Sequence, residues 1–233
     1  MKGIVIIPAY NEAGNIAGVL AALRRDAPEF DCVVVDDGSS DATAAICRAQ
    51  GCRVLSLAVN LGIGGAMQTG YRYAARHGYD VAVQIDGDGQ HDPACLAAML
   101  DALTAQGADM VIGSRFLAGE GYQSTLLRRW GIRYFSALIR ALTGTTVTDP
   151  TSGCRMVRRE LIEAFAADYP PDYPEPESVT DVLRRGGRVV ELPVQMRARG
   201  GGSSSIGALA SLYYVVKVTF AILLSALPSL RRS

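Results

Sequence analysis

Two aspartates and a glutamine occupy alternate positions directly after an apolar segment. They are Asp86, Asp88 and Gln90, which follow residues 81–85 and are separated by glycines. In an extended chain, alternate side chains point to the same side, and glycine lets the backbone come close to a ligand. Mg²⁺ and Mn²⁺ prefer such carboxylate and carbonyl oxygens, and they complete their coordination with substrate phosphates and water. The spacing predicts a divalent-metal site, and a solvated acidic turn is the simpler alternative.

Short β-branched segments alternate with segments of helical periodicity along the first half of the chain. The expected strands are residues 3–7, 32–35, 53–57, 81–85 and 110–112. The expected helices are residues 15–25, 41–50, 65–76 and 93–106. The strands are nearly continuous in Val and Ile, which is typical of strands buried on both faces. The alternation predicts an α/β fold with a mainly parallel, doubly covered sheet, in which ligands bind at the carboxyl ends of the strands.

The loops after the first four expected strands carry the polar and glycine-rich motifs. They are residues 8–12, 36–41, 60–66 and 86–91. Tyr10 offers an aromatic face, and Glu12 and Asp37 can accept hydrogen bonds from a nucleobase N–H or from ribose hydroxyls. A phosphate beside these acids requires a cation, which Asp86 and Asp88 can hold. Because the four loops are expected at one edge of the sheet, we expect a ligand site there.

Composition excludes several other classes of protein. The chain has 233 residues, enough for one substantial domain. Its 23 basic residues balance 23 acidic ones, so no net positive charge attracts nucleic acid. Five cysteines without a Cys-x-x-Cys pair argue against a disulfide scaffold or a zinc site. The chain enters its first strand without a signal peptide, and we expect a reducing cytoplasm. It lacks the glycine fingerprint of dinucleotide-binding proteins and the Gly-Lys-Ser/Thr phosphate loop.

Taken in chain order, the motifs resemble those of glycosyltransferase family 2. The matching segments are residues 8–12, 35–41, 60–66, 86–91, 113–115, 149–155 and 197–205. The chain is most similar to the subgroup of dolichyl-phosphate mannose synthases and bacterial polyprenyl-phosphate glycosyltransferases. The resemblance implies a GT-A fold, with a Rossmann-like sheet, over residues 1–200. It also implies a nucleotide-diphosphate sugar as donor, Mg²⁺ or Mn²⁺ as cofactor, and inversion at the anomeric carbon.

The resemblance also assigns roles to residues by position. The nucleoside would be held by Pro8, Tyr10, Glu12 and Asp37. The metal and the diphosphate would be bound by Asp86, Asp88 and Gln90. Arg115 would approach the phosphates, and Arg197 or Arg199 would close over them from a glycine-hinged lid. A plain linker to the last helix is the alternative for this glycine- and serine-rich segment.

The acceptor is less clearly indicated. Arg129 and Arg133 lie one turn apart on an expected helix, a spacing that could grip a phosphate or form a solvated basic face. An ionised lipid phosphate needs no general base, whereas a sugar hydroxyl does. Glu175 or Glu177 could be that base, or both could be acids favoured at a helix N-terminus. We predict hexose transfer to polyprenyl phosphate, with Asp88, Arg115 and Glu177 as catalytic residues, and transfer to a glycan or glycolipid hydroxyl in cell-envelope synthesis as the alternative.

Residues 201–233 are expected to form a separate C-terminal unit. Apolar residues recur at helical spacing over residues 206–230, and a span of about 20 such residues can cross a bilayer. Lys217 near the middle and two terminal arginines instead favour a helix in the membrane interface, or a contact with a second copy or a membrane protein. We therefore expect the enzyme at the cytoplasmic face of the membrane, peripheral or anchored by its C-terminus.

Two further classes share parts of this pattern. A nucleotidyltransferase has a similar sheet and metal site, but it is disfavoured because no glycine-rich Arg/Lys loop follows the first strand. A non-catalytic sugar-nucleotide sensor that serves a membrane protein remains compatible with the sequence.

Overall fold

The computed structural model describes residues 1–117, 126–196 and 208–225. Its described residues form a seven-stranded sheet in the order β3-β2-β1-β4-β6-β5-β7. The strands are β1 Gly3–Ala9, β2 Phe30–Asp36, β3 Arg53–Ser56, β4 Val81–Gln84, β5 Met110–Ser114, β6 Arg155–Arg158 and β7 Val189–Pro193. The helices are α1 Ile16–Asp26, α2 Thr43–Ala49, α3 Gly62–Arg76, α4 Cys95–Ala105, α5 Leu126–Thr143, α6 Arg159–Ala167, α7 Pro174–Arg184 and α8 Ala208–Ser225.

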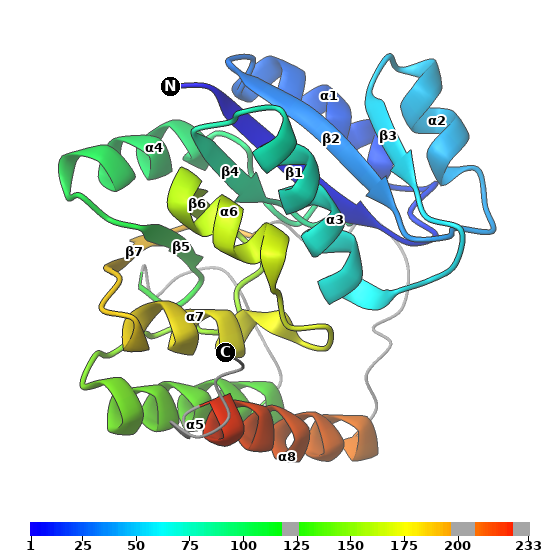
Figure 1. Ribbon diagram of the computed structural model, residues 1–233. Coiled ribbons are helices and arrows are strands. Elements are labelled where there is room, and N and C mark those ends of the chain that lie inside the picture. Colours follow the sequence, from blue (N-terminus) through cyan, green and yellow to red (C-terminus); the bar gives the residue numbers. More distant parts are fainter. Residues whose placement is uncertain (118–125, 197–207, 226–233) are drawn as a thin grey trace.

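Helices cover both faces of the sheet (Figure 1). Because side chains alternate along a strand, Val5 and Ile7 of β1 pack into one apolar cluster with α1 and α4. Ile4 and Ile6 of the same strand pack into a second cluster with α3, α6 and α7. All four side chains are buried. This double burial explains the continuous Val and Ile runs, and it confirms the expected α/β sheet.

One strand runs against the others. β6 pairs antiparallel with both β4 and β5, whereas β1, β2, β3 and β4 pair in parallel, and β5 pairs in parallel with β7. The sequence pattern did not predict β6 or β7. β6 reads Arg-Met-Val-Arg, and its first residue, Arg155, is a fully buried cation, which periodicity cannot anticipate. The predicted strand at residues 81–85 ends one residue early, at Gln84.

The chain does not stay extended through the acidic motif. Residues 87–89 turn, and Gly89 adopts φ 77°, a left-handed conformation that glycine accepts without strain. The expectation that Asp86, Asp88 and Gln90 share one side of a strand is therefore wrong. The turn instead brings these residues over the end of the sheet.

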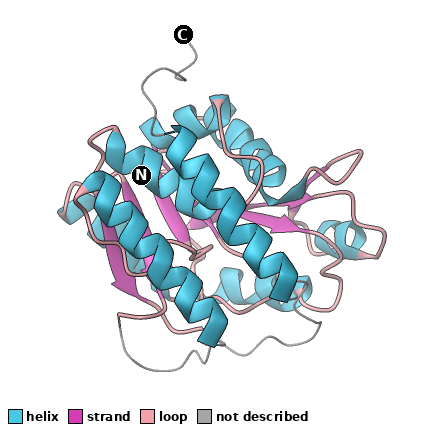
Figure 2. Ribbon diagram, turned by 90° about the horizontal axis from the view of Figure 1, so that it is seen from below, coloured by secondary structure: helices cyan, strands magenta, loops and turns pink. Residues whose placement is uncertain are grey.

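A third layer lies below the sheet, where α5 and α8 run side by side (Figures 1 and 2). Phe135 of α5 and Val218 and Ile222 of α8 form a small buried cluster. Lys217 forms an ion pair with Asp172, at 2.6 Å between Nζ and Oδ2, and both side chains stay partly exposed. Within the described ranges, no helix combines the length and the apolar character that crossing a membrane requires. The division at residue 200 stays a prediction.

Candidate active site

The loops after β1 and β4 meet at the carboxyl edge of the sheet. A Cβ added to Gly87 would lie 3.3 Å from the Pro8 carbonyl oxygen and 3.6 Å from Cγ of Glu12. The Glu12 carboxylate is held by Asn15, whose Nδ2 donates a hydrogen bond to Oε2 at 2.8 Å. Tyr10 is 52% exposed beside them. The structure thus brings the proposed nucleoside residues next to the acidic motif, with an aromatic ring open to solvent.

Asp86 is fixed from two sides. Its Oδ2 lies 3.2 Å from Nε2 of His91, which is buried. On the other side, a Cβ at Gly153 would lie 2.7 Å from the same oxygen, so only glycine leaves room for the carboxylate. Desolvation raises the pKa of Asp86, but the hydrogen bond and charge of His91, together with smaller contributions from Gln84 and Arg115, outweigh it and hold the pKa below its ordinary value. Asp86 is therefore an oriented carboxylate, and its side chain remains 38% exposed.

The donor set fits a hard divalent cation that also needs substrate oxygens. Asp88 accepts a hydrogen bond from the backbone N–H of Gln90 at 3.0 Å, which orients its carboxylate within the turn. Asp86, Asp88 and Gln90 all supply oxygen, the ligand type of Mg²⁺ and Mn²⁺. In the described part of the chain, no group of three or more His, Cys, Asp or Glu side chains is placed to hold a metal ion by itself.

Asp37 is a capping residue as well as a candidate ligand. Its two carboxylate oxygens accept hydrogen bonds from the backbone N–H groups of Leu61 and Gly62, at 2.7 and 2.9 Å, where α3 begins. Burial raises the pKa of Asp37 above its ordinary value, against the lowering effect of these two hydrogen bonds. Each oxygen keeps a second acceptor position. A ribose or base contact at Asp37 stays a prediction that this geometry permits.

Arg115 is bound to Asp149 rather than free to reach a ligand. Its Nε and Nη2 donate to the two carboxylate oxygens of Asp149 at 2.7 and 2.6 Å, and Nη2 also contacts Oγ1 of Thr151 at 2.9 Å. The Arg115 and Asp149 side chains are 4% and 0% exposed. The pair joins the end of β5 to the loop that carries Gly153. A phosphate contact by Arg115 stays a prediction, and its observed role is to hold that loop.

Of the two acids at the start of α7, Glu175 is the one whose carboxyl interacts electrostatically with Asp86 and Arg115. The buried Arg155 donates hydrogen bonds to the Glu175 carbonyl at 2.6 Å and to Ser178 Oγ at 2.9 Å. Burial raises the pKa of Glu175, against the charge of Arg155, and the charges of Asp86 and Arg115 also act on it.

Glu177 lies among different charges. Its pKa is raised by burial and then by the carboxylates of Asp168, which directly follows α6, and of Asp181, which lies one turn further along α7. A role for Glu177 as general base stays a prediction, and Glu175 is the alternative already open from the sequence.

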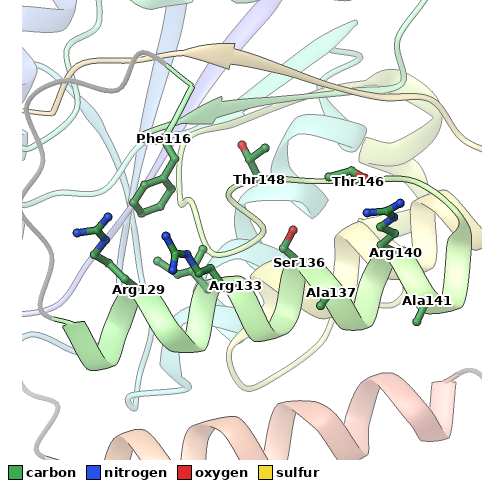
Figure 3. Close-up of a pocket in the computed structure, with 10 residues that line it drawn as sticks. Phe116, Arg129, Arg133, Ser136, Ala137, Arg140, Ala141, Thr146 and Thr148 are labelled. Atoms are coloured by element: carbon green, nitrogen blue, oxygen red, sulfur yellow. The ribbon is translucent and has the colours of Figure 1, made fainter.

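Arg129 and Arg133 of α5 line one groove. The groove has a volume of about 790 Å³ and runs along α5. Both guanidinium groups lie at the end of the groove near Phe116, and Ser136 points towards Thr148 (Figure 3). Phe116 follows Arg115 directly, so this end of the groove adjoins the Arg115–Asp149 pair. Arg197 and Arg199, the predicted lid residues, lie outside the described residues.

Asp149 and Arg155 were not assigned a role from their residue types. The family resemblance did include residues 149–155. Their contact with Asp86 depends on the antiparallel pairing of β6 with β4, which no local sequence pattern predicts.

Comparisons with known proteins agree with this geometry. Residues 4–165 match the family model described as glycosyl transferase family 2. The chain is 35% identical over 228 residues to an undecaprenyl-phosphate mannosyltransferase of Micrococcus luteus, covering 94% of this chain and 93% of the relative. It is 32% identical to a polyprenol monophosphomannose synthase of Mycolicibacterium smegmatis, covering 88% and 81%.

A solved structure gives the same result for the fold. The glucosyl-3-phosphoglycerate synthase of Mycobacterium tuberculosis, in complex with Mn²⁺ and UDP-glucose, aligns with a TM-score of 0.72 at 25% identity. The alignment covers 97% of this chain and 78% of that one. The α/β sheet is thus that of the GT-A glycosyltransferases. From the family match and the geometry of the site, we conclude that the chain belongs to glycosyl transferase family 2 and is a glycosyltransferase.

Proposed function

We propose that the enzyme transfers a hexose from a nucleotide-diphosphate sugar to a polyprenyl phosphate, with Mg²⁺ or Mn²⁺ and with inversion. The observation that carries this proposal is the groove along α5, in which two arginines adjoin the loop that supports Asp86. Paired guanidinium groups bind phosphate through charge-assisted hydrogen bonds. The relatives from M. luteus and M. smegmatis, named for transfer to or synthesis of polyprenol phosphates, support the same acceptor.

On the donor side, Pro8, Tyr10, Glu12 and Asp37 would hold the nucleoside, and Asp86, Asp88 and Gln90 would hold the metal. When bound, the metal supplies a Lewis acid for the diphosphate leaving group. His91 and Gly153 keep the Asp86 carboxylate in place before substrate arrives, so little reorganisation is needed during the reaction. Arg197 and Arg199 would contact the donor phosphates.

On the acceptor side, a phosphate in the groove needs no proton removed before it attacks. Arg129 and Arg133 would bind two of its oxygens and orient the third towards the donor. This orientation converts an encounter of two anions into a reaction within one complex. The arginines also offset the charge repulsion between the acceptor phosphate and the donor diphosphate.

Replacing Arg129 and Arg133 together by alanine is expected to raise the KM for a short polyprenyl phosphate by about 10²-fold, since charge-assisted hydrogen bonds are lost. The measurement is nucleotide release with Mn²⁺ across a panel of nucleotide sugars, with and without the lipid phosphate. Arg25→Ala, an exposed arginine on α1, is the matched control and should keep the wild-type KM. Turnover that is indifferent to the lipid phosphate, or an unchanged KM in the double variant, contradicts the proposed acceptor.

We further propose that the α5–α8 surface lies on the membrane that carries the acceptor. Trp130 and Tyr134 of α5 and Val216 and Phe220 of α8 are exposed large apolar side chains, and Trp130 is 74% exposed. The two helices lie side by side (Figure 2). Aromatic and apolar residues on a helix surface are typical of a peripheral membrane contact. This surface belongs to the same helix as the two groove arginines.

Trp130 is the only tryptophan, so it reports this contact directly. Its fluorescence is expected to shift to the blue when vesicles of phosphatidylglycerol and phosphatidylcholine are added, because the indole leaves water. Phe220→Asp should weaken the shift, and Leu117→Asp, an exposed apolar residue outside the two helices, should not. Emission that stays constant over a vesicle titration would exclude this surface.

A second candidate acceptor is a sugar hydroxyl, and Glu175 favours it. Burial raises the pKa of Glu175, and a general base needs a pKa raised towards the working pH. Glu175 also interacts electrostatically with Asp86 and Arg115 at the candidate site.

Glu175→Gln distinguishes the two acceptors. With a lipid phosphate as acceptor, the variant should retain kcat within about 10-fold, because no proton is transferred to Glu175. With a hydroxyl acceptor it should lose about 10²-fold to 10⁴-fold. Glu177→Gln, two residues away and beside Asp168 and Asp181, is the matched control for both cases.

A further inference from the structure

Two cysteines lie in contact at the amino ends of neighbouring strands, on the side of the sheet away from the candidate active site. The sulfur atoms of Cys32 and Cys52 are 3.7 Å apart. Cys32 is in β2, and Cys52 directly precedes β3, whose first residue, Arg53, pairs with Val33. Both cysteines are free and partly exposed. Neighbouring positions on paired strands place the two Cβ atoms near each other, which a disulfide requires.

The surroundings of the pair favour an anionic thiol reagent. Cys32 and Cys52 line a cleft of about 800 Å³, to which three arginines, Arg24, Arg48 and Arg53, and one acid, Asp31, also contribute. The hydrogen bond between Cys52 and Cys32 and the charge of Arg24 lower the pKa of the Cys52 thiol, although burial opposes the shift. A thiol with a lowered pKa in an electropositive and accessible place is the reactive kind.

The third cysteine of this region differs. Cys47 is fully buried on α2, and burial raises the pKa of its thiol to about 11. A buried thiol of this kind is inert. The chain thus offers an internal control within the same cluster.

We infer that Cys32 and Cys52 form a redox site that closes into a disulfide when it meets an anionic low-molecular-weight disulfide. The Cys52 thiolate attacks one sulfur of the reagent, whose S–S bond breaks and releases one thiolate. Cys32 then loses its proton to water and attacks the Cys52 sulfur of the mixed disulfide, which releases the second thiolate. Two protein thiols are oxidised to one disulfide, and the reagent is reduced to two thiols.

The bond ties the edge strand of the sheet to its neighbour. β3 is one of the two edge strands of the described sheet and has four residues, so few hydrogen bonds hold it. The two cysteines are 20 positions apart, and closing a loop of this length restricts the unfolded chain. The melting midpoint is therefore expected to rise by about 5 °C on oxidation and to return on reduction. The thiol chemistry is independent of glycosyl transfer.

The experiment treats the full chain with oxidised glutathione, alkylates the remaining thiols and maps non-reduced peptides by mass spectrometry. The expected result is a loss of two of the five thiols and a cross-linked peptide that contains Cys32 and Cys52. Cys47→Ser should give the same cross-link. Cys32→Ser should instead stop at a glutathione adduct on Cys52.

Three outcomes overturn the inference. They are a cross-link between other cysteines, such as Cys95 and Cys154, a wild-type protein that keeps all five thiols, and a stable glutathione adduct on wild-type Cys52. A cross-link between Cys32 and Cys52 that lowers the melting midpoint overturns the stabilising role of the bond.

Discussion

Replacing Asp88 by alanine is expected to lower the rate of transfer by about 10³-fold, the largest loss of activity that this site predicts. Asp88 is oriented in the turn by the backbone N–H of Gln90, and its carboxylate is one of two that can hold the divalent cation. Removing it leaves the diphosphate leaving group with a weakly held metal. The measurement is the initial rate of nucleotide release at saturating Mn²⁺, together with Mn²⁺ affinity by electron paramagnetic resonance, which does not depend on turnover.

The matched control is Asp101→Ala. Asp101 is an exposed aspartate on α4, away from the strand ends, and it should keep both the rate and the metal affinity. Wild-type activity of Asp88→Ala in the presence of a chelator would show that the reaction needs neither this carboxylate nor a metal.

Asp149→Ala is expected to give the largest loss of stability, about 3–5 kcal/mol in the free energy of unfolding. Arg115 and Asp149 are almost fully buried and joined by two side-chain hydrogen bonds. Without Asp149, the guanidinium keeps its charge in a place that water does not reach. Chemical denaturation followed by circular dichroism measures the change. Loop 149–153 should also lose its position, so Asp86 loses the close contact with Gly153.

The double variant Asp149→Ala/Arg115→Met is the control, because replacing both partners by uncharged side chains removes the unpaired charge. It should recover a large part of the lost stability. If the free energy of unfolding of Asp149→Ala lies within about 1 kcal/mol of the wild-type value, the ion pair does not stabilise the fold as its burial indicates.

The expected strands and helices of the first half are all present, and the physical reason is local. A strand buried on both faces must be apolar throughout, so β1, β2, β4 and β5 are visible as Val and Ile runs. β6 has no such signature, because it begins with Arg155 and carries a second arginine. Arg155 can be buried because three carbonyls and a hydroxyl accept its hydrogen bonds: those of Pro150, Ser152 and Glu175, and Ser178 Oγ. The partners at Pro150 and Ser152 are local, but those at Glu175 and Ser178 lie 20 and 23 positions further along the chain, on α7.

The candidate site shows the same limit. Asp86, Asp88, Glu12 and Asp37 could be proposed because each directly follows a recognisable strand. The choice between Glu175 and Glu177 could not be made, since two residues on a helix are separated by about 200° and face nearly opposite directions. Which of them faces the site depends on how α7 is rotated against α5 and the sheet. The buried contacts of Arg155 set that rotation, and the sequence pattern does not report them.

Loop 149–153 contacts both the proposed acceptor groove along α5 and the acidic motif on the donor side of the site. At one end, Asp149 holds Arg115, which adjoins the groove along α5. At the other end, Gly153 lies against the Asp86 carboxylate. A substitution that reshapes the groove for a new acceptor therefore also displaces a proposed metal ligand. Because one loop contacts both parts of the site, substitutions that change acceptor preference should also change donor binding as the family diverges. Compensating substitutions should therefore concentrate in these five residues.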